Sequence, residues 1–201
     1  MDLPPGIDIE PDALPRCWPA VDACETEGER TGSRWICVEW ANGSCERGAA
    51  CAKRHRAPTE ADEQRLLFSA DGVTHDIFGR PRIAATNSVA DPGSSSTLHV
   101  KGLPPSRTAQ ERRAALELLS EWGELAKTWT LADPSEGYVK FKKRSCAQMC
   151  AEAMHGRPLR PDYGGALEIS VVALDPGKVQ ASQARAPPPR AAPARPPTPH
   201  C

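Results

Sequence analysis

The chain has 201 residues, enough for one or two modest domains, and its hydrophobic share of 39% with a charged share of 25% favours folded material. Its net charge of −1 argues against a large non-specific attraction to nucleic acid, so any such contact must be local. No run of about 18 apolar residues occurs, so we expect no membrane span. The acidic N-terminus also lacks the apolar core of a secretory signal.

Eight cysteines and 21 prolines determine how the chain is organised. We expect an intracellular protein, in which thiols stay reduced and a disulfide framework is disfavoured. Residues 1–15 are acidic and rich in proline, which indicates a flexible arm. Residues 16–75 contain most of the cysteines and three tryptophans, and we expect a small folded domain there.

The stretch CVEWANGSCERGAACAKRH, residues 37–55, has the pattern C-x7-C-x5-C-x3-H. Three thiolates and one imidazole are a common tetrahedral ligand set for structural zinc. Four protein ligands close the coordination shell and leave no position for a catalytic water. The pattern therefore predicts one structural Zn²⁺ coupled to folding, with the ligands Cys37, Cys45, Cys51 and His55.

The glycines near this pattern are predicted to have a structural role, whereas two cysteines and a tryptophan each have two possible roles. Gly43 and Gly48 lie where the backbone must turn tightly around an ion. Cys17 and Cys24 lie outside the ligand set, and we expect buried thiols, with alternative metal ligation as the other possibility. Trp40 is either a core residue or a stacking surface.

A helix is predicted after Pro58, with Thr59 as its cap and Asp62 or Glu63 in the first turn. The following stretches, DIFGRPR at 76–82 and ATNSVADPGSSS at 85–96, are typical of a turn and a linker. Residues 76–96 are therefore predicted to be a connector.

Residues 97–176 are predicted to fold in the order β-α-β-β-α-β, which makes the whole chain α+β. Cys146 and Cys150 lie one turn apart on the second helix of this unit and are expected in its core. The predicted strands are 97–102, 125–131, 136–142 and 166–174, and the predicted helices are 108–122 and 145–156.

Strand alternation divides the side chains of this unit between the core and an open sheet face. The residues predicted in the core are Val100, Val139 and Phe141. Those predicted on the open face are His99, Lys101, Glu136, Tyr138 and Lys140.

The last stretch, residues 177–201, carries four basic and no acidic side chains and is rich in proline and alanine. Such a composition cannot bury a core, so we expect a disordered or polyproline-like tail.

The cysteine and histidine pattern resembles the CCCH zinc fingers that bind single-stranded RNA. Many of those fingers carry aromatic residues at the two slots that here hold Arg47 and Lys53. Arg47 can still stack through its guanidinium plane, and Lys53, Arg54 and Arg56 can contact phosphates.

The second unit resembles an RNA recognition motif, or RRM. LHVKGL at 98–103 resembles its hexamer and EGYVKF at 136–141 the end of its octamer. Tyr138 keeps a standard aromatic position, His99 can stack more weakly, and Glu136 would repel a phosphate. Two interpretations stay open: weak RNA binding completed by neighbouring elements, and an RRM adapted to protein binding.

The combination resembles the Cwc-two family of splicing factors, whose metazoan relative is RNA-binding-motif protein twenty-two. The matching stretches include TGSRWIC (31–37), HRAPTEAD (55–62), HDIFGRPR (75–82), TLHVKGLP (97–104) and GYVKFKKR (137–144). In that family the finger lies inside a torus domain, and a connector joins it to the RRM.

This resemblance implies a nuclear, spliceosomal role. Such proteins bind U6 snRNA near the catalytic centre, together with pre-mRNA, and associate with the Prp-nineteen-related complex without performing the chemistry. A monomer is expected outside the complex. The residues expected to contact RNA are His99, Tyr138, Lys101, Lys140, Trp40, Arg47, Lys53, Arg54, Phe78, Arg80 and Arg82.

Two other functions are compatible with the same features. The finger alone is typical of regulators of mRNA stability or translation, and the RRM helices with the proline-rich tail are compatible with a protein-interaction adaptor. An enzyme is not expected, because the sequence offers no nucleophile–base set, no phosphate-binding loop and no open metal position.

Overall fold

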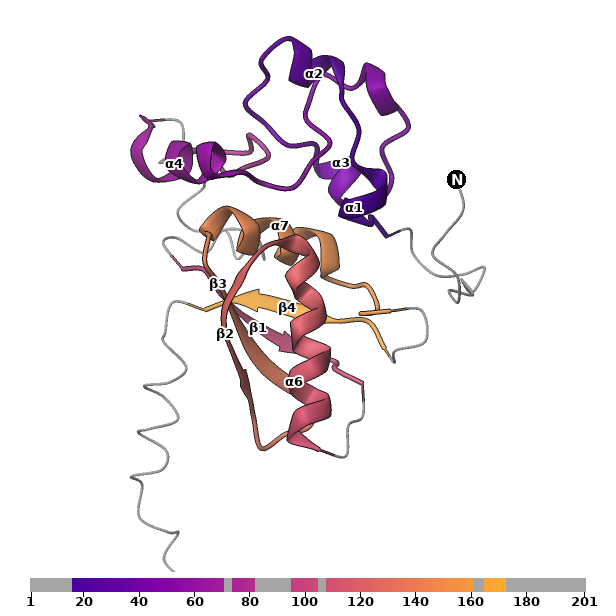
Figure 1. The fold of residues 1–201 in the computed structure, drawn as a ribbon, viewed down its shortest axis with the longest axis vertical. Coiled ribbons are helices and arrows are strands. Elements are labelled where there is room, and N and C mark those ends of the chain that lie inside the picture. The colour runs from indigo at the N-terminus through magenta and orange to yellow at the C-terminus, as the bar shows by residue number, and fades with distance from the viewer. Residues whose placement is uncertain (1–15, 71–73, 82–94, 105–107, 161–164, 173–201) are drawn as a thin grey trace, which may run out of the picture.

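The computed structural model describes residues 16–70, 74–81, 95–104, 108–160 and 165–172 (Figure 1). The predicted arm at 1–15, Arg82, most of the predicted connector and the predicted tail at 177–201 lie outside the described residues. Among the residues that are described, no helix is long and apolar enough to cross a membrane.

The N-terminal part consists of short helices separated by turns. Thr26 caps the second of them, because its hydroxyl accepts a hydrogen bond from the Glu29 N–H. Thr59 and Asp62 form a capping box at the start of the longest helix, which begins where the sequence predicts it. The elements are α1 (Pro19–Asp22), α2 (Glu27–Arg30), α3 (Val38–Ala41), η1 (Gly48–Ala50) and α4 (Glu60–Phe68).

The C-terminal part has the predicted order β-α-β-β-α-β. Its four strands form one antiparallel sheet in the order β2-β3-β1-β4, the arrangement of a ferredoxin-like fold. The elements are β1 (Thr97–Lys101), α6 (Ala109–Glu117), η2 (Leu118–Trp122), β2 (Leu125–Thr130), β3 (Glu136–Phe141), α7 (Arg144–Met154) and β4 (Glu168–Val171).

The two faces of the sheet differ as alternation predicts. Val100, Val139 and Phe141 are almost fully buried beneath the helices. Tyr138 lies opposite His99 in the register of β1 and β3, on the face that α6 and α7 leave uncovered. The helices therefore cover one face of the sheet (Figure 1), and the RRM-like residues of the first and third strands share the other.

Helix α7 lies between the sheet and the N-terminal part of the chain (Figure 1). Nearly every residue of α7 is buried, including the predicted core cysteines Cys146 and Cys150. A helix on the surface of an isolated domain would keep one polar face in solvent. The burial of α7 on both sides shows that the two parts share one core.

Polar contacts fix the two parts relative to one another. Arg16 forms an ion pair with Glu121 of η2. The Ile77 N–H donates to Oε1 of Gln148 at 3.2 Å, and Arg157 on the C-terminal part donates to the Asn42 carbonyl oxygen. These contacts join three different segments of the N-terminal part to the C-terminal part, so both parts form a single body.

Candidate metal centre and nucleic-acid interface

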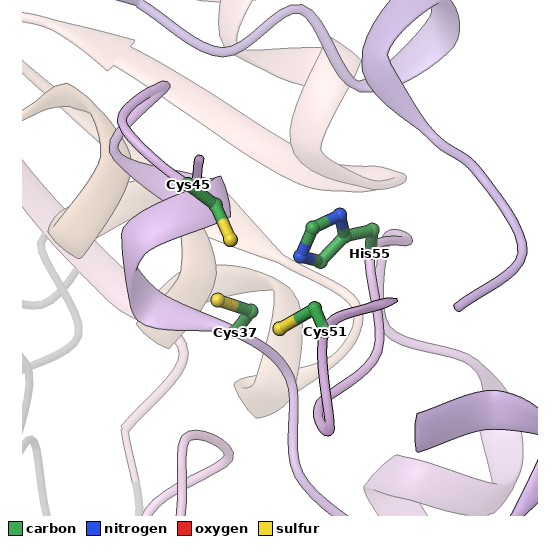
Figure 2. Close-up of side chains that lie close together, drawn as sticks. All are labelled: Cys37, Cys45, Cys51 and His55. Carbon is green, nitrogen blue, oxygen red and sulfur yellow. The ribbon is translucent and has the colours of Figure 1, made fainter. Parts of the chain in front are cut away.

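The four predicted metal ligands come together in the N-terminal part (Figure 2). Cys37 caps α3 and its sulfur accepts a hydrogen bond from the Trp40 N–H at 3.4 Å. Cys45 follows the turn at Gly43, whose φ of +71° suits glycine, and Cys51 ends η1. One donor atom from each ligand lies within 4.8 Å of all the others.

The geometry of the four donors fits a metal ion. Tetrahedral zinc–thiolate bonds of about 2.3 Å place sulfur ligands about 3.8 Å apart, which is compatible with donors that all lie within 4.8 Å of one another. Nε2 of His55 is buried and has no hydrogen-bond partner within the described part of the chain. A buried nitrogen without a partner is costly, and an ion between the four donors would satisfy it.

The histidine ligand is held by contacts on its ring and on its second nitrogen. The Trp40 indole stacks on the His55 imidazole, with 5.7 Å between ring centroids and 11° between planes. Sγ of Cys24 lies 3.6 Å from Nδ1 of His55, and the Cys24 N–H donates to the His55 carbonyl oxygen at 3.2 Å. Nδ1 therefore faces Cys24, which leaves Nε2 for the cluster.

The two remaining cysteines of this region differ from each other. Cys17 is buried as predicted, whereas Cys24 is exposed, so the prediction of a buried thiol is wrong for Cys24. Neither belongs to the four-residue cluster. The spacing of the cysteines could not predict that Cys24 lies beside His55, because the isolated bridge between them pairs residues far apart in sequence.

Burial changes the pKa of one thiol of the cluster strongly. It raises the pKa of Cys37 to about 11, because a thiolate loses its hydration inside the protein. A metal cation supplies the charge that compensates such thiolates. The cluster can therefore hold a metal ion, as its donor set suggests.

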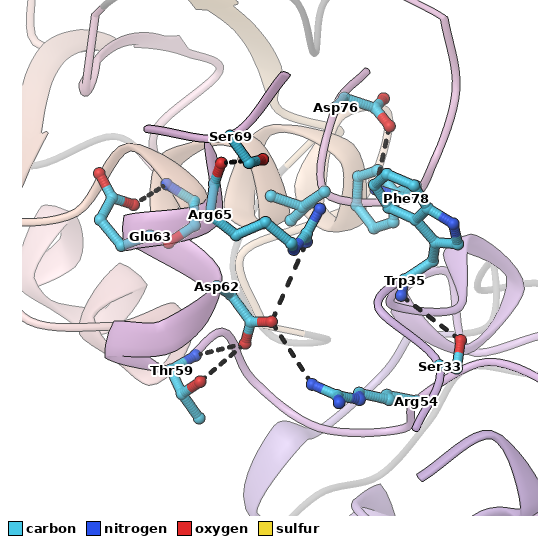
Figure 3. A network of polar contacts seen from close by, with 12 residues as sticks. Ser33, Trp35, Arg54, Thr59, Asp62, Glu63, Arg65, Ser69, Asp76 and Phe78 are labelled. Carbon is cyan, nitrogen blue, oxygen red and sulfur yellow. Dashed lines mark hydrogen bonds and ion pairs between the residues drawn. The ribbon is translucent and has the colours of Figure 1, made fainter. Parts of the chain in front are cut away.

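A buried carboxylate connects the finger to α4 (Figure 3). Asp62 accepts hydrogen bonds from the N–H and hydroxyl of Thr59 and from Nη1 of Arg56. It also pairs with Arg54 at 3.6 Å and with Arg65 at 4.0 Å. Asp62 therefore pairs with cationic side chains at the end of the finger and in the segment that follows it.

The aromatic ring of Trp35 packs between α4 and the start of the connector (Figure 3). The Arg65 guanidinium lies 4.6 Å from its centroid, and the His75 ring centroid lies 5.6 Å away. A Cβ added at Gly79 would come within 2.8 Å of the ring, and Gly79 has a φ of +80°. The glycine of the stretch DIFGRPR, Gly79, is therefore required by close packing.

Two residues predicted to contact RNA are core residues instead. Phe78 is fully buried, and its carbonyl oxygen accepts a hydrogen bond from Nζ of Lys53. Trp40 is 5% exposed and its indole N–H donates to the Asp22 carbonyl oxygen. Neither ring offers a free stacking surface, because the local fold uses both for packing.

The predicted basic contacts divide in a similar way. Arg80 forms ion pairs with Asp76 and Glu152, and Arg54 pairs with Asp62. Arg47 is exposed beside Glu39. Some arginines of the connector and the finger therefore form ion pairs within the protein, while others lie exposed to solvent.

The open sheet face brings His99 and Tyr138 together. Their rings stack with centroids 4.5 Å apart, and Nε2 of His99 lies 2.9 Å from a carboxylate oxygen of Glu136. Trp129 of β2 lies opposite Tyr138 in the register, so it belongs to the same face. Trp129 was not among the residues predicted to contact RNA, although strand alternation with a bulge near the start of β2 would have placed it on this face.

Comparison with known proteins agrees with this architecture. A family model for the Torus domain matches residues 8–80, which includes 76–80 from the predicted connector. The curated "Pre-mRNA-splicing factor cwc2" of Dictyostelium discoideum is 30% identical over 77% of this chain and 28% of its own length. The corresponding Saccharomyces cerevisiae protein is 26% identical over 70% of this chain and 44% of its own length.

The chain thus spans less than half the length of these relatives. Among solved structures, the RRM domain of S. pombe Puf1 is 24% identical, with a TM-score of 0.33, over 40% of this chain and all of that one. An "SXL-lethal protein/RNA complex" is 21% identical with the same TM-score, over 57% and 69%. With a match to the Torus domain followed by a ferredoxin-like sheet, the chain is similar to the pre-mRNA-splicing factors named CWC2.

Proposed function

We propose that this chain is the RNA-binding part of a pre-mRNA splicing factor. The observation that carries the proposal is the union of finger, connector and RRM in one body, in a chain related to splicing factors named CWC2. A rigid body can combine several small RNA contacts without one large basic patch, which agrees with a net charge of −1.

The proposed RNA is U6 snRNA with adjoining pre-mRNA near the spliceosome catalytic centre. Some of the residues predicted to contact RNA are exposed or half-exposed, and these lie on the open sheet face and in the segment from Cys37 to His55. They are His99, Tyr138, Lys101, Lys140, Arg47 and Lys53, with Arg54 and Arg80 in supporting positions. The proposal places the protein in the nucleus, with proteins of the Prp-nineteen-related complex as partners, and gives it no chemical step.

The proposed metal is one structural Zn²⁺ held by Cys37, Cys45, Cys51 and His55. Three thiolates and an imidazole nitrogen suit zinc, and the ion would supply the crosslink that a loop-rich segment otherwise lacks. Cys45→Ser should therefore release zinc and unfold the region around residues 16–80. A zinc-independent, cooperative melt of that region would contradict the structural role.

The RNA proposal is tested by crosslinking in nuclear extract, mapped to both residue and nucleotide. We expect crosslinks to U6 snRNA, and recovery of messenger RNA alone would favour a regulator of mRNA stability. With purified protein, Tyr138→Ala should weaken RNA binding by about 1–3 kcal/mol if a base stacks there. Phe68→Ala is a matched control, because Phe68 is 83% exposed but lies on α4, which packs on the α7 side.

A protein-interaction adaptor is the second candidate. An adaptor that used the RRM helices would need them exposed, and α7 is covered by the N-terminal part. Helix α6 keeps an open flank, with Arg113 and Glu117 beside a surface hollow. The adaptor would predict that Tyr138→Ala leaves function intact.

A further inference from the structure

Two lysines of the open sheet face lie directly opposite each other. Lys127 of β2 pairs in register with Lys140 of β3, and cross-strand partners share a face. Neither has a carboxylate partner among the described residues. The other lysines in the described part of the chain each have an acceptor: Lys53 on the Phe78 carbonyl oxygen, Lys101 near Glu136, Lys142 on Glu124 and Lys143 on Glu60.

This pair is unfavourable for the isolated fold. Like charges that lie directly opposite on two strands are destabilising. The Lys127 ammonium is held 5.0 Å from the centroid of the Trp129 ring, which is its one described contact with a ring. The Lys127 ammonium is therefore held at the corner of the sheet where Lys140 lies opposite it, and an anion there can contact both side chains.

Charge changes sign along the sheet face. At one end Lys101 lies opposite Glu136 on one side and Glu168 on the other, so carboxylates dominate. The stacked rings of His99 and Tyr138 occupy the middle. A polyanion that crosses this face is repelled at the Glu136 end.

We propose that Lys127 and Lys140 form a phosphate-binding site for the backbone of single-stranded RNA. Lys140 follows Tyr138 by two residues on the same face. A base stacked on Tyr138 would thus have its phosphate beside the lysine pair, and the strand would run away from Glu136. This inference rests on the proposed RNA-binding function and adds the path of the backbone.

The test measures how salt affects binding of a fluorescein-labelled 12-nucleotide oligouridine by fluorescence anisotropy. Each phosphate contact to a single strand contributes about 0.7 to the slope of log K against log salt. Lys127→Gln and Lys140→Gln should each lower the slope by about 0.7. Raising KCl from 50 to 200 mM lowers the affinity of both proteins. The factor of this decrease should be about sevenfold smaller for the double variant than for the wild type, since the slopes differ by about 1.4.

Lys142→Gln is the matched control. Lys142 follows Lys140 by two residues but already pairs with Glu124, so its loss should leave the slope unchanged. Thermal melts of all variants check the fold, which should not weaken when one of two opposed charges is removed.

The possible outcomes separate this inference from the proposed function. Lower slopes for both lysine variants, with an unchanged slope for Lys142→Gln, support the site. Unchanged slopes in the lysine variants, with weaker binding by Tyr138→Ala, overturn the site and leave RNA binding in place. If the wild type binds neither oligouridine nor U6 snRNA, the proposed function fails and the site fails with it.

Discussion

The carboxylate of Glu63 on α4 caps the N-terminus of α7. Its two oxygens accept hydrogen bonds from the backbone N–H groups of Arg144 at 2.9 Å and Ser145 at 2.7 Å. These donors have no partner inside the helix, and the helix dipole favours a negative charge at this end. A side chain of the N-terminal part thus completes a helix of the C-terminal part.

Replacing Glu63 should lower the free energy of unfolding, because its side chain joins the two parts. Glu63→Ala leaves two backbone donors of a buried helix end without partners, and we expect a loss of about 1–3 kcal/mol in the free energy of unfolding. Urea unfolding followed by circular dichroism measures it. The control is Glu60→Ala, which removes an exposed carboxylate paired with Lys143, one that should contribute little. Equal losses in the two variants would contradict the capping role.

Stability should fall in acid through Asp62. Burial by itself would raise the pKa of this carboxyl, but hydrogen bonds from Arg56 and Thr59 with the Arg56 charge lower it below its usual value. A depressed pKa in the folded state contributes stability above the unfolded pKa of about 3.9, and this contribution is lost as the pH falls through the folded value.

Asp62→Asn should therefore flatten the decline of the free energy of unfolding as the pH falls below about 4. Glu29→Gln removes the other carboxylate of Arg56 and keeps Asp62, so it should retain the acid dependence of the wild type. If Asp62→Asn loses stability in acid as steeply as the wild type, another group controls the transition.

The contact between Cys24 and His55 should tune metal affinity. With a metal on Nε2, the imidazole carries its proton on Nδ1 and can donate it to Sγ of Cys24, 3.6 Å away. Such outer contacts typically change metal affinity 10- to 100-fold, and because sulfur is a weak acceptor we expect Cys24→Ala to weaken zinc binding about tenfold. Competition with a chromophoric chelator measures the affinity.

Cys24→Ser offers an oxygen acceptor at the same position and should restore most of the zinc affinity. The backbone bond from the Cys24 N–H to the His55 carbonyl remains in both variants, so the comparison isolates the side chain. An affinity that is the same in wild type and Cys24→Ala would show that the thiol does not orient the ligand.

The close approach of Gly79 to Trp35 predicts a steric effect. Gly79→Ala adds a Cβ within 2.8 Å of the Trp35 ring at a φ of +80°. Gly32→Ala has nearly the same φ, +76°, with no atom within 4 Å of the added Cβ. The control should cost about 1–2 kcal/mol for the left-handed conformation. Gly79→Ala should cost more and should change the tryptophan fluorescence, and equal costs would contradict the packing.

Local chemistry in the sequence was enough to predict several features. The Cys37, Cys45, Cys51 and His55 spacing located the cluster, because ligands of one small knot lie close along the chain. Thr59 located the start of α4, and two-residue alternation placed His99 and Tyr138 on one face of the sheet.

Only the tertiary structure decided which of the remaining side chains face solvent. Phe78 and Trp40 are aromatic residues of the kind that stack on bases, but both are buried. Two cations, Arg56 and Arg80, pair with carboxylates distant in sequence, Glu29 and Glu152. Trp129 and Lys127 joined the sheet face through strand register, and Glu63 reached α7 across the interface. The physical reason is the same throughout: periodicity determines the face of an element, while burial and pairing depend on what another element brings against that face.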